Sequence, residues 1–108
     1  MLESRIEGRL GRIVRQLGGR SYKWVSPGND GVPDRIVVMP GSLVYLVETK
    51  QLGEKARALQ KAQHQRLRDL GCQVFVLAGM DDVEMFKEIL INDQRKAEGG
   101  EHDGVPST

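Results

Sequence analysis

Two acidic residues and a lysine near the middle of the chain have the spacing expected for metal-assisted phosphoryl chemistry. Asp34 follows a loop rich in Gly and Pro, and Glu48 and Lys50 are two positions apart on an apolar stretch. Carboxylate oxygens are preferred ligands of Mg²⁺ and Mn²⁺, and an ammonium group beside them can neutralise charge that develops on a phosphate. The spacing alone fits equally a charge cluster at the edge of a sheet, so the fold must decide between the two interpretations.

A predicted β-hairpin brings the two acids together. Residues 34–39 and 43–50 have strand composition, and turn formers occupy residues 40–42. With a three-residue turn, the numbers of cross-strand partners sum to 82, so Asp34 lies opposite Glu48 with Cβ atoms about 5 Å apart. A two-residue turn would place Asp34 opposite Val47. We expect the first register, in which a shared divalent cation offsets the repulsion between the carboxylates.

Alternation along the second strand places Val44, Leu46, Glu48 and Lys50 on one face of the sheet. We expect Val44 and Leu46 to lead from the core to the two charged side chains.

Helices on either side of the hairpin supply further candidates. Residues 3–18 carry apolar side chains at three- and four-residue steps. Glu7 falls on that stripe, where a carboxylate is costly without a partner, so it either reaches the metal or lies at the solvent edge of the stripe. Residues 56–70 form a second helix, in which Gln60 or Gln63 could hydrogen-bond a phosphate or a carboxylate, or could be an ordinary surface glutamine.

The remaining patterns complete an α/β domain. Residues 21–25 and 73–78 are predicted strands, the latter in the middle of the sheet, and residues 81–91 form a last amphipathic helix. The order α-β-β-β-α-β-α indicates a mixed sheet flanked by helices. We assign residues 1–91 to one domain and expect residues 92–108, which are polar and rich in glycine, to form a disordered tail.

The charge distribution is more informative than the net charge of +1, because basic residues concentrate in residues 1–28 and 50–68. Such a surface can bind a polyanion, although a solvated helix surface fits the same distribution. The sequence has one cysteine, no secretory signal and no apolar run that could span a bilayer, which favours a cytoplasmic protein without membrane contact. The candidate DNA-contacting residues are Arg5, Arg9, Arg12, Lys23, Arg35, Arg57 and Lys61.

Several other side chains have a structural interpretation. We expect Cys72 to be a small buried hydrophobe and His64 to lie on the surface of the second helix, without metal-ligand spacing. The aromatic side chains expected in the core are Tyr22, Trp24 and Tyr45.

Three segments together resemble the VRR-NUC domain of the PD-(D/E)XK nuclease superfamily: Gly31-Val32-Pro33-Asp34-Arg35, Val47-Glu48-Thr49-Lys50, and Gln60 on the following helix. The resemblance runs from about residue 3 to residue 91 and implies a restriction-endonuclease-like core. It implies that Asp34, Glu48 and the Thr49 backbone carbonyl hold Mg²⁺ or Mn²⁺, and that Lys50 is the catalytic lysine. Glu7 matches the N-terminal acid of the family, which could add a metal ligand, and Gln60 matches its helix glutamine.

Stand-alone chains of this length resemble phage-encoded members of the family. That resemblance implies a homodimer that cuts branched DNA, such as a four-way junction, in a bacterial host cell. We therefore expect a Mg²⁺- or Mn²⁺-dependent DNA endonuclease. The alternative is a DNA-binding module that keeps the fold and the basic surface without catalysis, although the intact Asp34, Glu48 and Lys50 argue against it.

Overall fold

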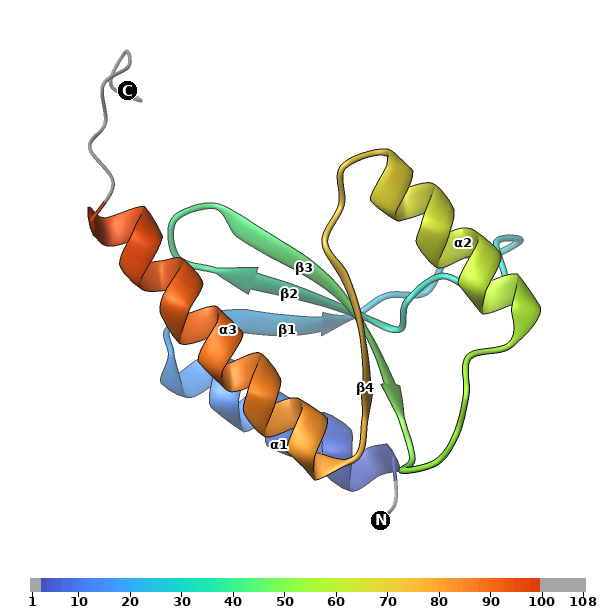
Figure 1. The fold of residues 1–108 in the computed structure, drawn as a ribbon, viewed down its shortest axis with the longest axis horizontal. Coiled ribbons are helices and arrows are strands. Elements are labelled where there is room, and N and C mark those ends of the chain that lie inside the picture. The colour runs from blue at the N-terminus through green and yellow to red at the C-terminus, as the bar shows by residue number, and fades with distance from the viewer. Residues whose placement is uncertain (1–2, 100–108) are drawn as a thin grey trace.

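A mixed four-stranded sheet with helices on both faces organises residues 3–99, which are the residues that the computed structural model describes (Figure 1). The helices and strands follow the predicted order α-β-β-β-α-β-α. They are α1 (Glu3–Gln16), β1 (Arg20–Lys23), β2 (Arg35–Met39), β3 (Leu43–Lys50), α2 (Ala58–Asp69), β4 (Val74–Ala78) and α3 (Met80–Gly99).

The strands lie side by side in the order β1-β2-β3-β4. The first three pair antiparallel, and β4 runs parallel to β3. Parallel pairing needs a crossover connection, which α2 provides. The expectation that residues 73–78 form a central strand is therefore wrong, because the hairpin partner β2 occupies one side of β3 and β4 becomes an edge strand.

The hairpin register is the one predicted from a three-residue turn. Met39 pairs with Leu43 and Arg35 with Val47, so partner numbers sum to 82. The ladder begins at Arg35, one residue after Asp34. The backbone at Asp34 is nevertheless anchored, because its carbonyl oxygen accepts a hydrogen bond of 2.8 Å from the Trp24 amide.

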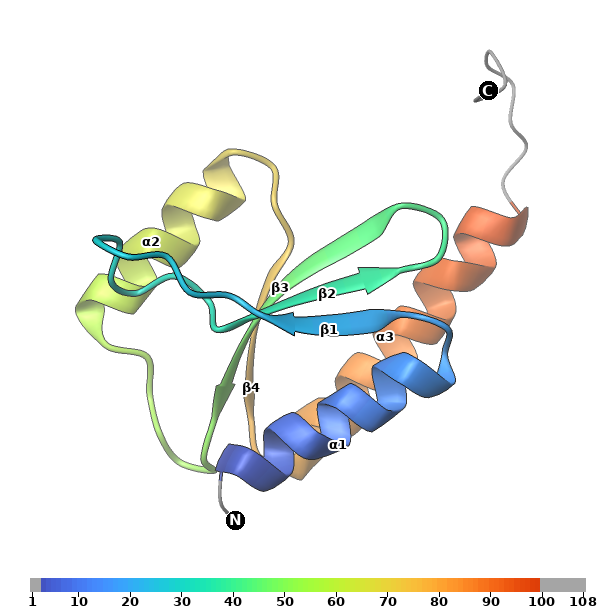
Figure 2. The ribbon, with the colours of Figure 1, turned by 180° about the vertical axis from the view of Figure 1, so that it is seen from behind.

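The main core lies between the sheet and the two helices α1 and α3 (Figure 2). On β3 the side chains of Tyr45, Val47 and Thr49 are fully buried, whereas Val44 is 47% exposed. The prediction that Val44 lies on the core side is therefore wrong, because α1 and α3 cover the opposite face. The core side chains from α1 and α3 are Ile6, Leu10, Ile13, Val14, Val83, Phe86 and Leu90.

Helix α3 continues beyond its predicted end at residue 91. Tyr45 Oη donates a 2.6 Å hydrogen bond to Asp93 Oδ2, and Gln94 Nε2 donates one of 3.0 Å to the Leu17 carbonyl. Polar contacts thus attach the last turns to the domain, and the expected tail is wrong for residues 92–99; residues 100–108 lie outside the described residues. Within residues 3–99, none of the helices has the length and apolar character required to cross a membrane.

Helix α2 packs differently from the prediction. His64, expected on the surface, is 1% exposed, whereas Leu59 is 55% exposed and Leu70 is 76% exposed. The inward-facing side of α2 therefore carries a histidine where apolar periodicity pointed to leucines. Cys72 is exposed in the turn after α2, which corrects the expectation that it is buried. Of the aromatic side chains expected in the core, Tyr45 is buried, Trp24 is half-buried and Tyr22 is 57% exposed.

The loop that carries Asp34 passes close to the beginning of α2 at Gly31. Gly31 has a φ of +92°, and a Cβ atom at this position would lie 2.9 Å from the Leu59 carbonyl oxygen. Only glycine combines that left-handed backbone with so close an approach.

We predict that Gly31→Ala lowers the free energy of unfolding by about 1 kcal/mol more than Gly28→Ala does. Both positions have positive φ, but a Cβ atom at Gly28 would have no heavy atom within 4 Å. The difference therefore isolates the contact between the loop and α2. Urea unfolding of both variants measures it, and equal losses would contradict a tight contact at Gly31.

Candidate active site

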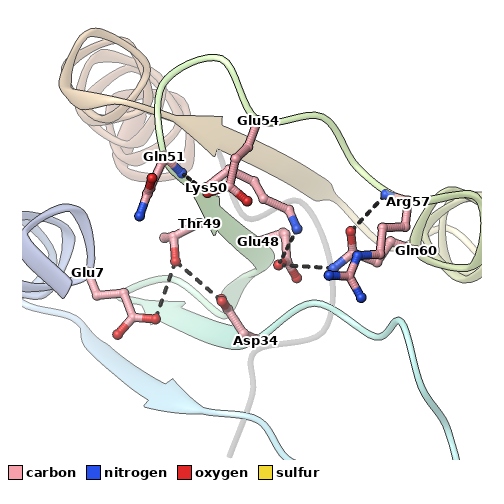
Figure 3. A network of polar contacts seen from close by, with 9 residues as sticks. All are labelled: Glu7, Asp34, Glu48, Thr49, Lys50, Gln51, Glu54, Arg57 and Gln60. Carbon is pink, nitrogen blue, oxygen red and sulfur yellow. Dashed lines mark hydrogen bonds and ion pairs between the residues drawn. The ribbon is translucent and has the colours of Figure 1, made fainter. Parts of the chain in front are cut away.

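The end of β3 carries three consecutive buried polar residues. Glu48 is 5% exposed, Thr49 0% and Lys50 8%. Alternation turns Thr49 toward α1, and Glu48 and Lys50 toward α2. Figures 1 and 2 both place the beginning of α1 beside the end of β3. Polar side chains from the hairpin and two helices therefore meet at this end of the strand (Figure 3).

On the α1 side, one hydroxyl lies between two acids. Thr49 Oγ1 is 3.3 Å from Glu7 Oε1 and 3.3 Å from Asp34 Oδ2. A hydroxyl has a single proton, so it can donate to only one of these carboxylates at a time. The structure thus places Glu7 beside Asp34, which is one of the two positions that the sequence left open.

Glu3 is a further acid at this position, which the sequence reasoning did not select. Carboxylate oxygens of Glu3, Glu7 and Asp34 all lie within 4.8 Å of one another. The signal was present in the sequence, because Glu3 and Glu7 are four residues apart and residues with that spacing share a helix face.

On the α2 side, Glu48 contacts a lysine and a glutamine. Glu48 Oε2 is 3.6 Å from Lys50 Nζ and accepts a 3.4 Å hydrogen bond from Gln60 Nε2. Gln60 Oε1 in turn accepts a 3.0 Å hydrogen bond from the Arg57 amide at the beginning of α2. Gln60 therefore caps the helix with its oxygen and holds Glu48 with its nitrogen. Gln63, the alternative candidate, is half-buried one turn further along α2.

Burial and mutual repulsion raise the pKa of both central acids. The pKa of Asp34 rises from 3.8 to about 6, first because burial penalises the carboxylate and second because of the negative charge of Glu7. The pKa of Glu48 rises from 4.5 to about 7, first through burial and second through the charge of Asp34, while Lys50 acts in the opposite direction. Both carboxylates are thus poorly compensated by the protein alone.

A hard divalent cation fits this environment. Asp34 Oδ1 is buried and has no hydrogen-bond partner, although a buried polar atom ordinarily has one. Its neighbours Glu3 and Glu7 offer carboxylate oxygens, which are the ligands that Mg²⁺ and Mn²⁺ prefer.

The structure modifies the predicted pairing of Asp34 with Glu48. The compact acidic group is Glu3–Glu7–Asp34, whereas Glu48 contacts Lys50 and Gln60. The physical reason is that Asp34 precedes the ladder, so the alternation of side chains along β2 does not constrain it, and it contacts the Thr49 hydroxyl instead. The two acids still interact, since Asp34 is the main charge that raises the pKa of Glu48.

The candidate DNA-contacting residues are spread over several surfaces. Arg12 and Arg35 line a groove beside Glu7, together with Arg15 and Arg20, which the sequence reasoning did not include. Arg9 forms a 2.9 Å ion pair with Glu84 of α3, which reduces its availability for a phosphate. The exposed candidates elsewhere are Arg5, Lys23, Arg57 and Lys61.

Comparison with known proteins agrees with this geometry. No protein-family model matches the sequence. A protein of Acyrthosiphon pisum secondary endosymbiont phage 1, named "Putative nuclease p44", is 48% identical over 79 residues, which cover 73% of this chain and 85% of that protein. The mixed sheet and this relative together indicate a nuclease-type fold. A solved structure described as "VRR_NUC domain" superimposes with a TM-score of 0.76 at 30% identity, covering 80% of this chain and 94% of the other. The chain belongs to the VRR-NUC family.

The raised pKa values of Asp34 and Glu48 predict that stability depends on pH. In the unfolded chain these groups titrate near 3.8 and 4.5, and in the folded protein at about 6 and about 7. The folded state therefore binds more protons over this range. The contribution of these two groups to the free energy of unfolding is largest below about pH 4, and it is lost as the pH rises through 6 and 7.

We expect the Tm of the metal-free wild type to fall between pH 5 and pH 8. The Tm of Asp34→Asn should fall less steeply over the same range, because one titrating group is removed. Added Mg²⁺ or Mn²⁺ should raise the wild-type Tm more at pH 8 than at pH 5, since protons compete with the metal. Differential scanning fluorimetry with EDTA as the reference measures both effects. The same pH slope in the wild type and Asp34→Asn would show that Asp34 does not titrate in this range.

Proposed function

We propose that this protein is a DNA endonuclease that uses Mg²⁺ or Mn²⁺ to hydrolyse phosphodiester bonds. The observation that carries the proposal is the end of β3, where a buried lysine and poorly compensated acids lie together without an evident structural benefit. Buried charges contribute little net stability, and a set of perturbed acids is typical of a functional site. The phage relative is named as a nuclease, which supports the same reaction class.

Asp34, Glu48 and the Thr49 backbone carbonyl would hold the metal, and Glu7 would add a ligand. A bound divalent cation would supply charge neutralisation and an activated water. Lys50, whose Nζ is 3.6 Å from Glu48 Oε2, would neutralise charge on the phosphate or orient the attacking water. Gln60 would keep the Glu48 carboxylate in place through its 3.4 Å hydrogen bond.

We predict that Asp34→Ala and Lys50→Ala each lower the cleavage rate by at least about 10²-fold, while DNA binding stays within a few-fold of the wild type. Binding survives because arginines outside the acid–lysine site make the phosphate contacts. The matched controls are Asp81→Ala and Lys96→Ala, which remove exposed charges on α3. Cleavage of labelled DNA and circular dichroism of each variant provide the readouts. Wild-type cleavage by Asp34→Ala would show that the active site is elsewhere.

The assay compares a four-way junction with a linear duplex, in Mg²⁺, in Mn²⁺ and in EDTA. We also propose that branched DNA is the preferred substrate, as the resemblance to phage-encoded members implies. This specificity requires faster cleavage of the junction, and metal dependence requires no cleavage in EDTA. Salt-sensitive binding without cleavage of either substrate would favour a non-catalytic DNA-binding module instead.

We further propose that the protein acts as a homodimer, because one site cuts one strand and symmetric cleavage needs a two-fold pair. An apolar sheet surface supports this proposal. Tyr22 is 57% exposed, Val38 37% and Val44 47%. The register puts these side chains on the same face, away from α1 and α3, with Ile36 and Leu46 between them.

We predict that Val44→Lys shifts the protein toward the monomer in sedimentation velocity, because the new charge would be buried in the interface. The control is Val25→Lys, at a valine that is 69% exposed in the loop after β1 and outside the sheet face. A wild-type protein that sediments as a monomer at micromolar concentration, alone and on junction DNA, would rule out the dimer. A dimer that Val44→Lys leaves intact would place the interface on another surface.

A further inference from the structure

A groove lined by arginines runs along α1 beside the proposed active site. It lies between α1 and the first two strands and has a volume of about 520 Å³. Glu7 lines it, so the groove is continuous with the acidic group around Asp34. Its basic lining residues are Arg12, Arg15, Arg20 and Arg35.

The groove exists because α1 lacks side chains along one stripe. Gly8 and Gly11 lie in the interior of α1 and line the groove. A glycine inside a helix costs about 1 kcal/mol relative to alanine, and a Cβ atom at Gly11 would have no heavy atom within 4 Å. Packing therefore does not require glycine at position 11. Because Gly8 and Gly11 have no side chains, the groove is deeper where they line it, between the arginines.

The wall of the groove contains donors without acceptors. Ser21 Oγ and Arg35 Nε are buried and have no hydrogen-bond partner. Within residues 3–99, none of the four groove arginines forms an ion pair with a carboxylate. Unmet donors are costly when buried, and a ligand that offers only acceptors would satisfy them.

We propose that this groove binds the backbone phosphates that flank the scissile phosphate, on the Glu7 side of the active site. The inference rests on the proposed nuclease function, and adds where the substrate strand lies. Phosphate oxygens are acceptors only, and arginine is well suited to bind them. Because its lining offers guanidinium groups and a hydroxyl to the backbone, the groove positions the strand without reading its sequence.

Two variants test the groove in different ways. Gly11→Leu fills the floor and should fold well, since leucine favours helix more than glycine does. A triple variant, Arg12→Gln, Arg15→Gln and Arg20→Gln, removes charge and leaves the floor open. The controls are Gln16→Leu, at an exposed position of the same helix, and Arg95→Gln, at an exposed position of α3.

The measurement is binding of a labelled oligonucleotide duplex in EDTA over a range of salt concentrations. Each phosphate contact that is removed should lower the slope of log K against log salt by about 0.9, so the triple variant should lose about that amount per arginine. Gly11→Leu should weaken binding at every salt concentration, whereas both controls should match the wild type. Wild-type affinity and slope in Gly11→Leu and the triple variant would overturn the proposal.

Cleavage kinetics separate failure of the groove from failure of the proposed function. If both proposals hold, the triple variant raises KM and largely keeps kcat, while Lys50→Ala lowers kcat and binds DNA normally. If no protein cleaves DNA but the triple variant loses its salt-dependent binding, the groove stands and the nuclease proposal fails. If Lys50→Ala is inactive while the triple variant retains wild-type binding and KM, the active site stands and the groove proposal fails.

Discussion

The Thr49 hydroxyl lies between the carboxylates of Glu7 and Asp34, and its single proton can be donated to only one of them at a time. With Glu7 and Asp34 each 3.3 Å from that oxygen and Glu3 close by, the protein holds more negative charge at one point than it neutralises. Thr49 and the end of β3 are buried and the three acids are half-buried, so water screens these charges only in part. A cation is therefore the natural complement, and the surrounding structure must hold the acids together in its absence.

Strand β3 makes this arrangement possible because it is an interior strand that is buried on both faces at its end. Thr49 turns toward α1 while its neighbours Glu48 and Lys50 turn toward α2. Two sets of polar contacts, on opposite faces, thus meet at one strand end. Asp34 can take part because the chain reaches it just before β2 joins the ladder, where its side chain is not committed to either face.

The helices and strands of this domain form three surfaces of different chemical character. The end of β3 gathers acids and a lysine, the groove between α1 and the first two strands gathers arginines, and the exposed part of the sheet face opposite α1 and α3 is apolar. The groove and the active site meet at Glu7, whereas the apolar surface lies on the face away from α1 and α3. They give the proposed substrate strand and the proposed second subunit separate places to bind.

The sequence by itself determined the order of the elements, the hairpin register and the family, because periodicity, turn residues and a short motif are local properties. It also pointed to Glu7, Asp34, Glu48, Lys50 and Gln60, which lie together at one strand end. Tertiary structure decided which faces are covered, so that His64 is buried while Val44 and Cys72 are exposed. It also extended α3 through polar contacts, which leave no periodic pattern in the sequence. It also brought Glu3 to Asp34 and Arg20 to Arg12, since proximity between distant segments depends on how helices dock on a sheet and not on the spacing of residues along the chain.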